Sequence, residues 1–292
     1  MLFRPCPVRI WTLMRQYLIP ATALLGLLLG SGCGTVASAT RPATRAIGEF
    51  VLGPEDEKKL GDQLAAEVKQ QEKVLGDAQV QSYVNTLGQR LVAQAPKEER
   101  PFNFQFTVID APDTVNAFAL PGGHIFVYSG LIRAASDEAE LASVLGHEIA
   151  HVTSGHARQQ LASQVGLGTL QQLLLGSDPN LLAQVGSTIV AQGYLAAYTR
   201  GMESEADKRG LQYLDGAGYD PAAMARFFDK LAKMQGSRPN FVASFFATHP
   251  DPGARAKEVN SLIQSRGYGG GQQAIVSKDF QDIQARVGGA VR

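Results

Sequence analysis

The spacing of apolar residues predicts two helices in the first third of the chain. The first opens at Pro54 with an acidic turn and ends near Gly76, and the second follows Asp77 and is closed by Pro96. The repeating apolar positions are Leu60, Leu64 and Val68 in the first helix and Val80, Tyr83, Val84, Leu87 and Leu91 in the second. Both helices are expected to pack into a core and to carry no chemistry.

Three short strands are predicted next. Residues 102–108 alternate between apolar and polar side chains, which is the period-two pattern of a half-buried strand. Residues 115–120 and 124–128 predict two more strands, because the turn sequence Pro-Gly-Gly at residues 121–123 separates them. A small antiparallel sheet is therefore expected.

A long helix is predicted after the strands, because Asp137 and Glu140 form a capping box at its start. The following residues 161–198 are apolar and rich in Gln and Gly, with a break at residues 176–180 between two helical halves. Two interpretations of this stretch stay open. It is either a packed helical arm or a mobile lid or membrane-surface contact.

The last third of the chain predicts two more helices, which begin at residues 220–221 and 251–252 with Asp-Pro in each case. Consecutive glycines then introduce a Gly-rich C-terminal tail over residues 266–292. The predicted fold class is α+β. A mainly helical domain with a small antiparallel sheet is expected over residues 47–265.

Composition and charge separate the N-terminal segment from this domain. The chain has 292 residues, 45% of them hydrophobic, which is enough to bury a full core. The whole chain has 27 basic residues, Lys and Arg, and 27 acidic residues. Residues 1–32 contain three arginines and no acidic residue, so residues 33–292 have 24 basic and 27 acidic residues. A mildly acidic domain argues against nucleic-acid binding. Residues 1–32 are typical of a lipoprotein-type signal peptide, and residues 33–46 of a flexible tether.

Cys33 is the only cysteine left once a leader containing Cys6 is removed. An unpaired thiol is unusual in an oxidising compartment, and lipidation of Cys33 explains it. The segment resembles a bacterial lipoprotein signal, which implies a lipid-anchored protein of the cell envelope that faces the periplasm, on the outer membrane in a Gram-negative cell. An uncleaved anchor, an unmodified thiol and a translation start at Met14 are the alternatives.

The strongest chemical signal is the sequence HEIAH at residues 147–151, which matches H-E-x-x-H. On a helix, His147 and His151 project from one face and can hold one zinc ion, while Glu148 lies beside the open coordination position. Glu148 is therefore the expected general base that activates a water molecule.

A catalytic zinc site needs a third protein ligand. The metzincin spacing would require Gly at position 154 and His at position 157, where this chain has Ser154 and Ala157, so His156 is not expected to be a ligand. Helical spacing points it away from the ligand face, and we expect it to support either the structure or a ligand from behind. Downstream, Glu203 and Asp207 lie one helical turn apart. We expect Glu203 to be the third ligand of one zinc ion per chain and Asp207 to accept the outer N–H of a ligand histidine. Two histidines and a glutamate define a gluzincin site.

Four segments, at residues 116–123, 146–152, 200–207 and 248–250, occur in the order typical of metallopeptidase family M48. Over roughly residues 50–265 the chain resembles this family, and most of all its periplasm-facing lipoprotein members, without the tetratricopeptide tail that some of them carry. The resemblance implies a zinc endopeptidase that hydrolyses misfolded or misassembled cell-envelope proteins. The alternative is a zinc-stabilised chaperone or assembly factor of the envelope with little or latched proteolysis.

The resemblance also suggests roles for residues outside the ligand set. Asn116 and Ala117 are similar to the edge-strand segment that pairs with the substrate backbone, although a buried Asn that caps the turn is an alternative. His249, which precedes Pro250, is similar to the downstream His-Pro pair of the family. Its expected roles are oxyanion stabilisation, a removable fourth zinc ligand, or a helix cap.

Overall fold

The computed structural model describes residues 52–176, 178–191, 197–268 and 278–290. The predicted signal peptide, Cys33 and the predicted tether lie outside these ranges. Of the helices in the described ranges, none combines the length and the apolar character needed to cross a membrane.

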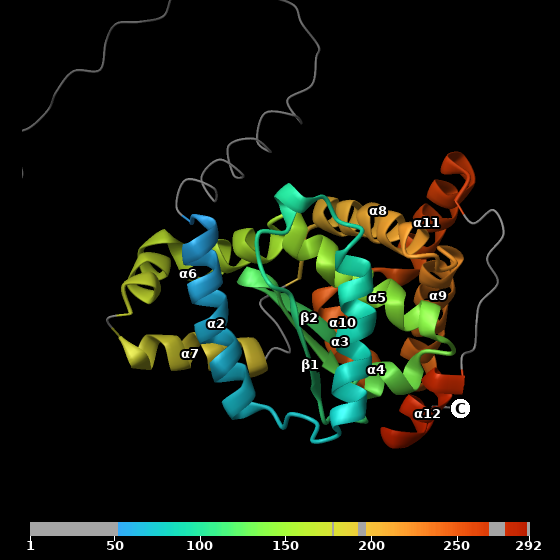
Figure 1. The fold of residues 1–292 in the computed structure, drawn as a ribbon, viewed down its shortest axis with the longest axis horizontal. Coiled ribbons are helices and arrows are strands. Elements are labelled where there is room, and N and C mark those ends of the chain that lie inside the picture. Colours follow the sequence, from blue (N-terminus) through green and yellow to red (C-terminus); the bar gives the residue numbers. More distant parts are fainter. Residues whose placement is uncertain (1–51, 177, 192–196, 269–277, 291–292) are drawn as a thin grey trace, which may run out of the picture. The chain divides into compact units, whose positions relative to one another are not determined.

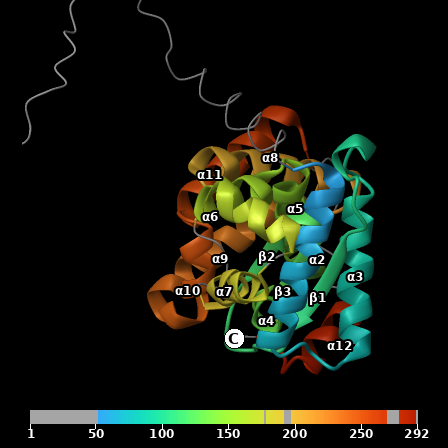
Figure 2. The ribbon, with the colours of Figure 1, turned by 90° about the vertical axis from the view of Figure 1, so that its left-hand side faces the viewer.

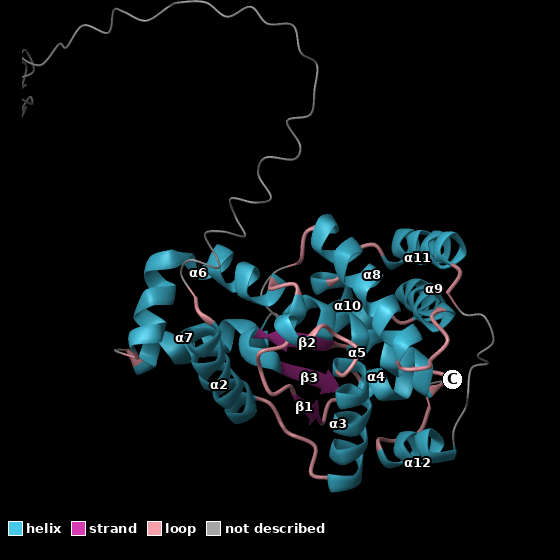
Figure 3. Cartoon of the chain, turned by 45° about the horizontal axis from the view of Figure 1, so that its top comes forward, coloured by secondary structure: helices cyan, strands magenta, loops and turns pink. Residues whose placement is uncertain are grey.

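The described part of the chain is mainly helical and contains a small three-stranded sheet (Figures 1 and 3). Its first half contains α2 (Pro54–Gln71), α3 (Ala78–Val92), η2 (Lys97–Glu99), β1 (Gln105–Ile109), β2 (Ala117–Leu120), η3 (Pro121–Gly123), β3 (His124–Tyr128) and α4 (Ser129–Ala134). Its second half contains α5 (Glu138–Thr153), α6 (His156–Leu175), α7 (Pro179–Ala191), α8 (Arg200–Gly216), α9 (Ala222–Ser237), α10 (Pro239–Thr248), α11 (Pro252–Arg266) and α12 (Lys278–Arg286).

The sheet has the strand order β1-β3-β2 and is mixed. β2 and β3 form an antiparallel hairpin, and their connecting turn needs glycine because Gly122 and Gly123 have φ angles of 77° and 90°. β1 runs parallel to β3, with Gln105 opposite His124. The predicted α+β class is confirmed. The expectation of a purely antiparallel sheet is corrected, because β3 inserts between β1 and β2 instead of following them at the edge.

Alternate residues of the sheet face two separate parts of the core. One face belongs to a buried cluster that also contains residues of α3, α5, α8 and α9, and the other to a cluster with residues of α2, α6 and α7. Figure 2 shows α2 crossing the second face, in agreement with its contacts to β2 and β3. The hairpin residues on the first face are Ala117, Ala119, Ile125 and Val127, and those on the second are Phe118, Leu120, Phe126 and Tyr128.

Helices α6 and α7 occupy the stretch whose role the sequence leaves open. The predicted break falls between them, and both helices contact α2. Leu170 and Leu173 of α6 and Ile189 of α7 are buried in this contact. Gly166, with φ 76°, interrupts the regular geometry of α6. These two helices thus pack against the domain through apolar side chains.

The predicted Gly-rich tail contains a further helix. α12 contacts α3, and its residues Phe280 and Ile283 are buried in the core. The Gln284 side chain donates hydrogen bonds to the backbone carbonyls of Ile132 and Ala135 at 3.0 and 2.7 Å. The end of the described chain is therefore attached to the domain by both apolar and polar contacts.

Gly61 provides a test of how α2 is positioned on the hairpin turn. A Cβ atom at this residue would lie 2.0 Å from the carbonyl oxygen of Pro121, so the helix and the turn must separate to accept it. Gly61→Ala is expected to lower the free energy of unfolding by about 1–3 kcal/mol, measured by chemical denaturation.

The matched control is Gly236→Ala in α9, where a Cβ atom meets nothing within 4 Å. This control is expected to be neutral or to stabilise the protein by up to about 1 kcal/mol, because alanine favours helix more than glycine does. Equal effects of the two substitutions would contradict the described packing of α2.

Candidate metal centre

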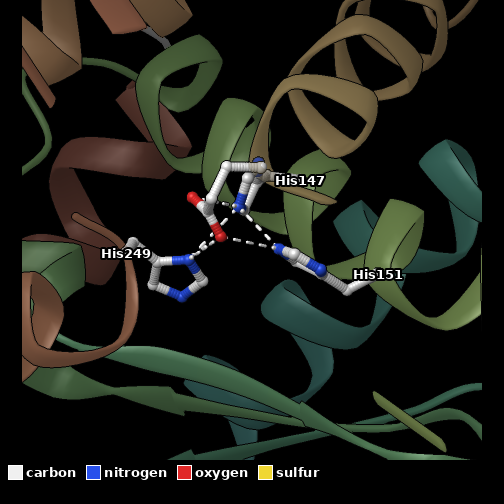
Figure 4. A group of neighbouring side chains, drawn as sticks. His147, His151 and His249 are labelled. Atoms are coloured by element: carbon white, nitrogen blue, oxygen red, sulfur yellow. Dashed lines mark hydrogen bonds and ion pairs between the residues drawn. The ribbon is translucent and has the colours of Figure 1, made fainter. Parts of the chain in front are cut away.

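Helix α5 carries the two histidines of the motif into the interior. Asp137 caps its first turn as expected and accepts a hydrogen bond from the backbone N–H of Glu140 at 2.8 Å. The Glu140 carboxylate reaches one residue beyond the cap and accepts a hydrogen bond from the backbone N–H of Ser136 at 2.7 Å. The helix packs against β2, α8 and α9 and is buried along most of its length. His147 and His151 point the same way, with their Nε2 atoms 3.0 Å apart (Figure 4).

Helix α8 brings Glu203 to these histidines. The two helices approach closely because Gly146 and Gly210 face each other: a Cβ atom on Gly210 would lie 3.2 Å from the backbone nitrogen of His147. Glu203 Oε1 lies 3.3 Å from His151 Nε2, and its Oε2 lies 3.6 Å from His147 Nε2. Glu203 thus completes the set of two imidazoles and one carboxylate.

His249 lies in the same cluster, at the C-terminal end of α10. Its Nδ1 atom is 3.1 Å from Glu203 Oε1 and 3.3 Å from His147 Nε2, and its side chain is buried. Figure 4 shows His249 facing the two motif histidines from a different segment of the chain. Burial acts to lower the pKa of His249, but the carboxylates of Glu203 and Glu148 outweigh burial and raise it.

The four donor atoms of His147, His151, Glu203 and His249 lie within 4.8 Å of one another. In tetrahedral zinc sites the ligand bonds of about 2.0–2.2 Å place the ligand atoms about 3.3–3.6 Å apart. The contacts in this cluster run from 3.0 to 3.6 Å. Burial lowers the pKa of both His147 and His151, which favours the neutral imidazole that binds metals. The residues therefore fit zinc in chemistry and in spacing.

Glu148 lies beside the donor cluster without belonging to it. Its side chain is fully buried, and its Oε1 atom lies 3.3 Å from His249 Nε2. Burial raises the pKa of Glu148 to about 7, although the charge of His249 opposes this shift. A carboxyl with this pKa can both accept and release a proton near neutral pH.

Asp207 and Arg255 hold the outer side of the cluster. Asp207 Oδ1 lies 2.9 Å from the outer nitrogen, Nδ1, of His147. Arg255, from α11, donates two hydrogen bonds to the Asp207 carboxylate at 2.6 and 2.8 Å and also pairs with Glu203. Its guanidinium carbon lies 4.2 Å from the centre of the Phe228 ring. Arg255 therefore bridges two carboxylates, that of Glu203 in the donor cluster and that of Asp207 on the outer side of His147.

The charges of this network determine the ionisation of the two carboxyls. Burial acts to raise the pKa of Glu203, but His249 and Arg255 hold it well below its usual range. Burial has the same effect on Asp207, and Arg255 again outweighs it, so that the pKa of Asp207 is lowered. Both carboxylates are thus kept ionised in the protein interior. The sequence gives no sign of Arg255, because an arginine in the first turns of a helix is usually solvated.

The outer side of His151 has different neighbours. His151 Nδ1 lies 3.1 Å from His156 Nδ1, and the ring of Tyr198 stacks on the His151 ring with centroids 3.6 Å apart. His156 is thus in contact with the cluster, in keeping with its expected supporting role, while Tyr198 has no recognisable signal in the sequence. Both residues restrict the orientation of the His151 ring.

Ala117 is the first residue of β2, the edge strand of the sheet that packs against α5, and Asn116 directly precedes it. Asn116 is buried, and its backbone carbonyl accepts a hydrogen bond from the Tyr128 N–H at 3.0 Å. Among the residues that the structure describes, β2 pairs with one strand, β3. Its other side is the edge of the sheet, next to the helix that carries the motif histidines.

Comparison with known proteins is consistent with this geometry. Residues 78–263 match the family model described as Peptidase family M48. The beta-barrel assembly-enhancing protease of Yersinia pestis is 35% identical over 257 residues, which cover 84% of this chain and 48% of the relative. The protein of the same name from Escherichia coli K12 is 30% identical over 254 residues, which cover 82% of this chain and 51% of the relative. Mitochondrial metalloendopeptidase OMA1 of Arabidopsis thaliana is 32% identical over 155 residues, covering 53% of this chain and 30% of the relative. The chain thus spans about half the length of the two bacterial relatives.

Arg255 provides a test of the charge network. Arg255→Met keeps most of the side-chain volume but leaves Glu203 and Asp207 buried without their cation. The metal-free protein is expected to lose about 3–5 kcal/mol of unfolding free energy, measured by urea denaturation.

The control is Arg226→Met, because Arg226 is 39% exposed and pairs with Asp220 at 2.6 Å. An ion pair of this exposure contributes less than about 1 kcal/mol. If Arg255→Met is no more destabilising than Arg226→Met, the buried network does not make the expected contribution to the free energy of unfolding.

Proposed function

The chain belongs to peptidase family M48, and we propose that it hydrolyses peptide bonds of misfolded or misassembled cell-envelope proteins. Membership of this family confirms the predicted family, the zinc cofactor and the metalloendopeptidase class. The observation that carries the proposal is the buried cluster of His147, His151 and Glu203 with Glu148 beside it. The names of the bacterial relatives, beta-barrel assembly-enhancing proteases, support the choice of envelope proteins as substrates.

In this proposal His147, His151 and Glu203 are the protein ligands of one zinc ion. A zinc ion in such a site polarises the scissile carbonyl and lowers the pKa of water to about 7. Asp207 accepts the outer N–H of His147 and so fixes the tautomer that offers Nε2 to the cluster. Arg255 holds Glu203 and Asp207 in place through the contacts described above.

Glu148 is the proposed general base and acid. Its carboxylate takes a proton from the attacking water and delivers it to the leaving amine, so the side chain must pass between its two protonation states in each cycle. The pKa of about 7 that burial gives to Glu148 supports both transfers near neutral pH.

Substrate is proposed to bind as an added strand along β2. Asn116 precedes this edge strand and Ala117 begins it. The strand lies next to α5, so an extended peptide paired with it would pass the motif helix. Backbone pairing tolerates many side chains, which suits an enzyme that acts on unfolded segments of different proteins.

His249 supports an alternative in which proteolysis is latched. Its Nδ1 atom lies 3.1 Å from Glu203 Oε1 and 3.3 Å from His147 Nε2, which are separations expected between ligands of one zinc ion. As the fourth zinc ligand, His249 would exclude the water that the reaction requires. The protein would then act mainly as a zinc-stabilised assembly factor of the envelope. Stabilisation of the oxyanion, another of the roles expected for His249, requires the ring to point at the substrate carbonyl.

The proposed location is the bacterial cell envelope, with a lipid on Cys33 as the anchor. The leader-like composition of residues 1–32 and the unpaired thiol support this location. Mass spectrometry of the mature protein is the test, and an unmodified Cys33 would remove the anchor from the proposal.

Glu148→Gln tests the proposed chemistry. The substitution keeps the shape of the side chain but removes the proton acceptor, so cleavage of unfolded casein is expected to fall at least about 100-fold while one zinc ion per chain is still bound. Glu258→Gln, the same change at an exposed position of α11, is the control and should cleave at the wild-type rate. Wild-type cleavage by Glu148→Gln would contradict the proposal.

His249→Ala separates the two roles of His249 that act on catalysis, the removable fourth ligand and the oxyanion stabiliser, from each other and from a helix cap, the loss of which leaves kcat unchanged. Because Nδ1 lies among the donor atoms, we expect removal of the ring to raise basal proteolysis, measured as kcat on a quenched fluorescent peptide. A buried histidine outside the cluster, His124, which pairs with Asp62 at 2.8 Å, is the matched control. A fall in kcat with unchanged KM would reject the latch and assign His249 to the oxyanion.

A further inference from the structure

The outer nitrogens of the two motif histidines face different chemical groups. His147 Nδ1 faces the carboxylate of Asp207, whereas His151 Nδ1 faces a second imidazole, that of His156, at 3.1 Å. His156 is buried, and its other nitrogen, Nε2, lies 3.6 Å from Glu205 Oε2. The contact between two imidazoles is the unusual one, because neither ring carries a fixed charge to hold the other.

Gly155 explains why His156 can reach His151. In a continuous helix, a residue five positions later lies about 140° around the axis and points away. Here α5 ends at Thr153, and Gly155 adopts a left-handed conformation with φ 70° and ψ 17° before α6 begins at His156. This reversal returns the His156 ring to the outer face of His151. The turn thus builds a contact that helical spacing excludes.

The geometry allows one arrangement of protons for neutral rings. If His151 offers the Nε2 lone pair to a metal, its proton must be on Nδ1 and must be donated to His156 Nδ1. His156 then carries its own proton on Nε2, which faces Glu205. A carboxylate at this place favours that tautomer, since it attracts the N–H and repels a lone pair.

Glu205 is itself held in place. Arg209 Nε lies 3.4 Å from Glu205 Oε1, one turn along α8, and the Arg209 guanidinium also pairs with Glu99 of η2. A chain of contacts therefore runs from His151 through His156 and Glu205 to the surface.

We propose that His156 and Glu205 are positioning residues that fix the tautomer and the ring orientation of His151 for zinc binding. The inference rests on the proposed function, in which His151 is a ligand. His156 touches neither substrate nor the reacting atoms, and it acts only through His151. Outer partners of ligand histidines contribute about 10- to 100-fold to metal affinity, and a contribution of this size is expected here.

Two substitutions of nearly equal shape test the role of the acceptor. His156→Asn can place an amide oxygen where the imidazole Nδ1 lies, whereas His156→Leu offers no acceptor. The zinc dissociation constant of the full chain, measured by competition with a chromogenic chelator, is expected to rise about 10- to 100-fold in His156→Leu and to stay within about fivefold of wild type in His156→Asn. Thermal unfolding of the metal-free variants checks that they fold.

Glu205→Gln and His124→Leu complete the experiment. Glu205 is 46% exposed, so its substitution does not endanger folding, and it is expected to weaken zinc binding measurably, by about two- to tenfold. His124→Leu removes a buried histidine that is also paired with a carboxylate but lies outside the cluster, and its zinc affinity should equal that of wild type.

Two results would overturn the inference. One is an unchanged zinc affinity in His156→Leu. The other is an equal loss in His156→Leu and His156→Asn, which would show that the acceptor is not what matters. Should His156→Leu fail to fold, an unchanged affinity in Glu205→Gln would have the same force. A wild-type chain that binds no zinc would instead reject the proposed function, so the two failures are distinguishable.

Discussion

Burial of charge is the constraint on which the rest of the structure depends. Glu203 and Asp207 are ionised carboxylates in the interior, and Arg255 is the buried cation that pairs with both. Buried charges are stable only with well-placed partners, and one guanidinium balances half of this negative charge. A divalent cation among the donor atoms would balance the rest, and it would favour the ionised form of Glu148, which is the form that accepts a proton. The donor cluster and its outer contacts therefore function as one electrostatic unit.

The fold assembles this unit from segments far apart in the sequence. Helix α5 lies between the edge strand β2 and helix α8, and the paired glycines Gly146 and Gly210 let α8 approach closely enough for Glu203 to reach both motif histidines. The end of α10 and the start of α11 then contribute His249 and Arg255. Because β2 packs on the same helix, one element joins the proposed substrate edge to the proposed chemistry.

Local patterns were enough to predict much of this arrangement. The spacing of His147 and His151, the Asp137 cap, the glycine turn and the bounds of β3 follow from periodicity and from short-range backbone preferences. Arg255 and Tyr198 were not predictable, because their roles depend on which helix packs against which. A supporting role for His156 is predictable, but helical spacing places its side chain away from His151, because it assumes that the helix continues where Gly155 reverses the chain. The parallel pairing of β1 with β3 likewise depends on the order of strands in space, which alternation alone does not give.

The most direct test of a zinc peptidase in this chain is cleavage of an unfolded protein under control of the metal. Purified protein would be incubated with reduced, unfolded casein before and after treatment with 1,10-phenanthroline, and again after addition of one equivalent of zinc, with metal content measured in parallel. The account predicts cleavage that is lost on chelation and restored by one zinc ion per chain. Cleavage that persists in metal-free protein, or zinc-loaded protein that never cleaves even after His249→Ala, would contradict it.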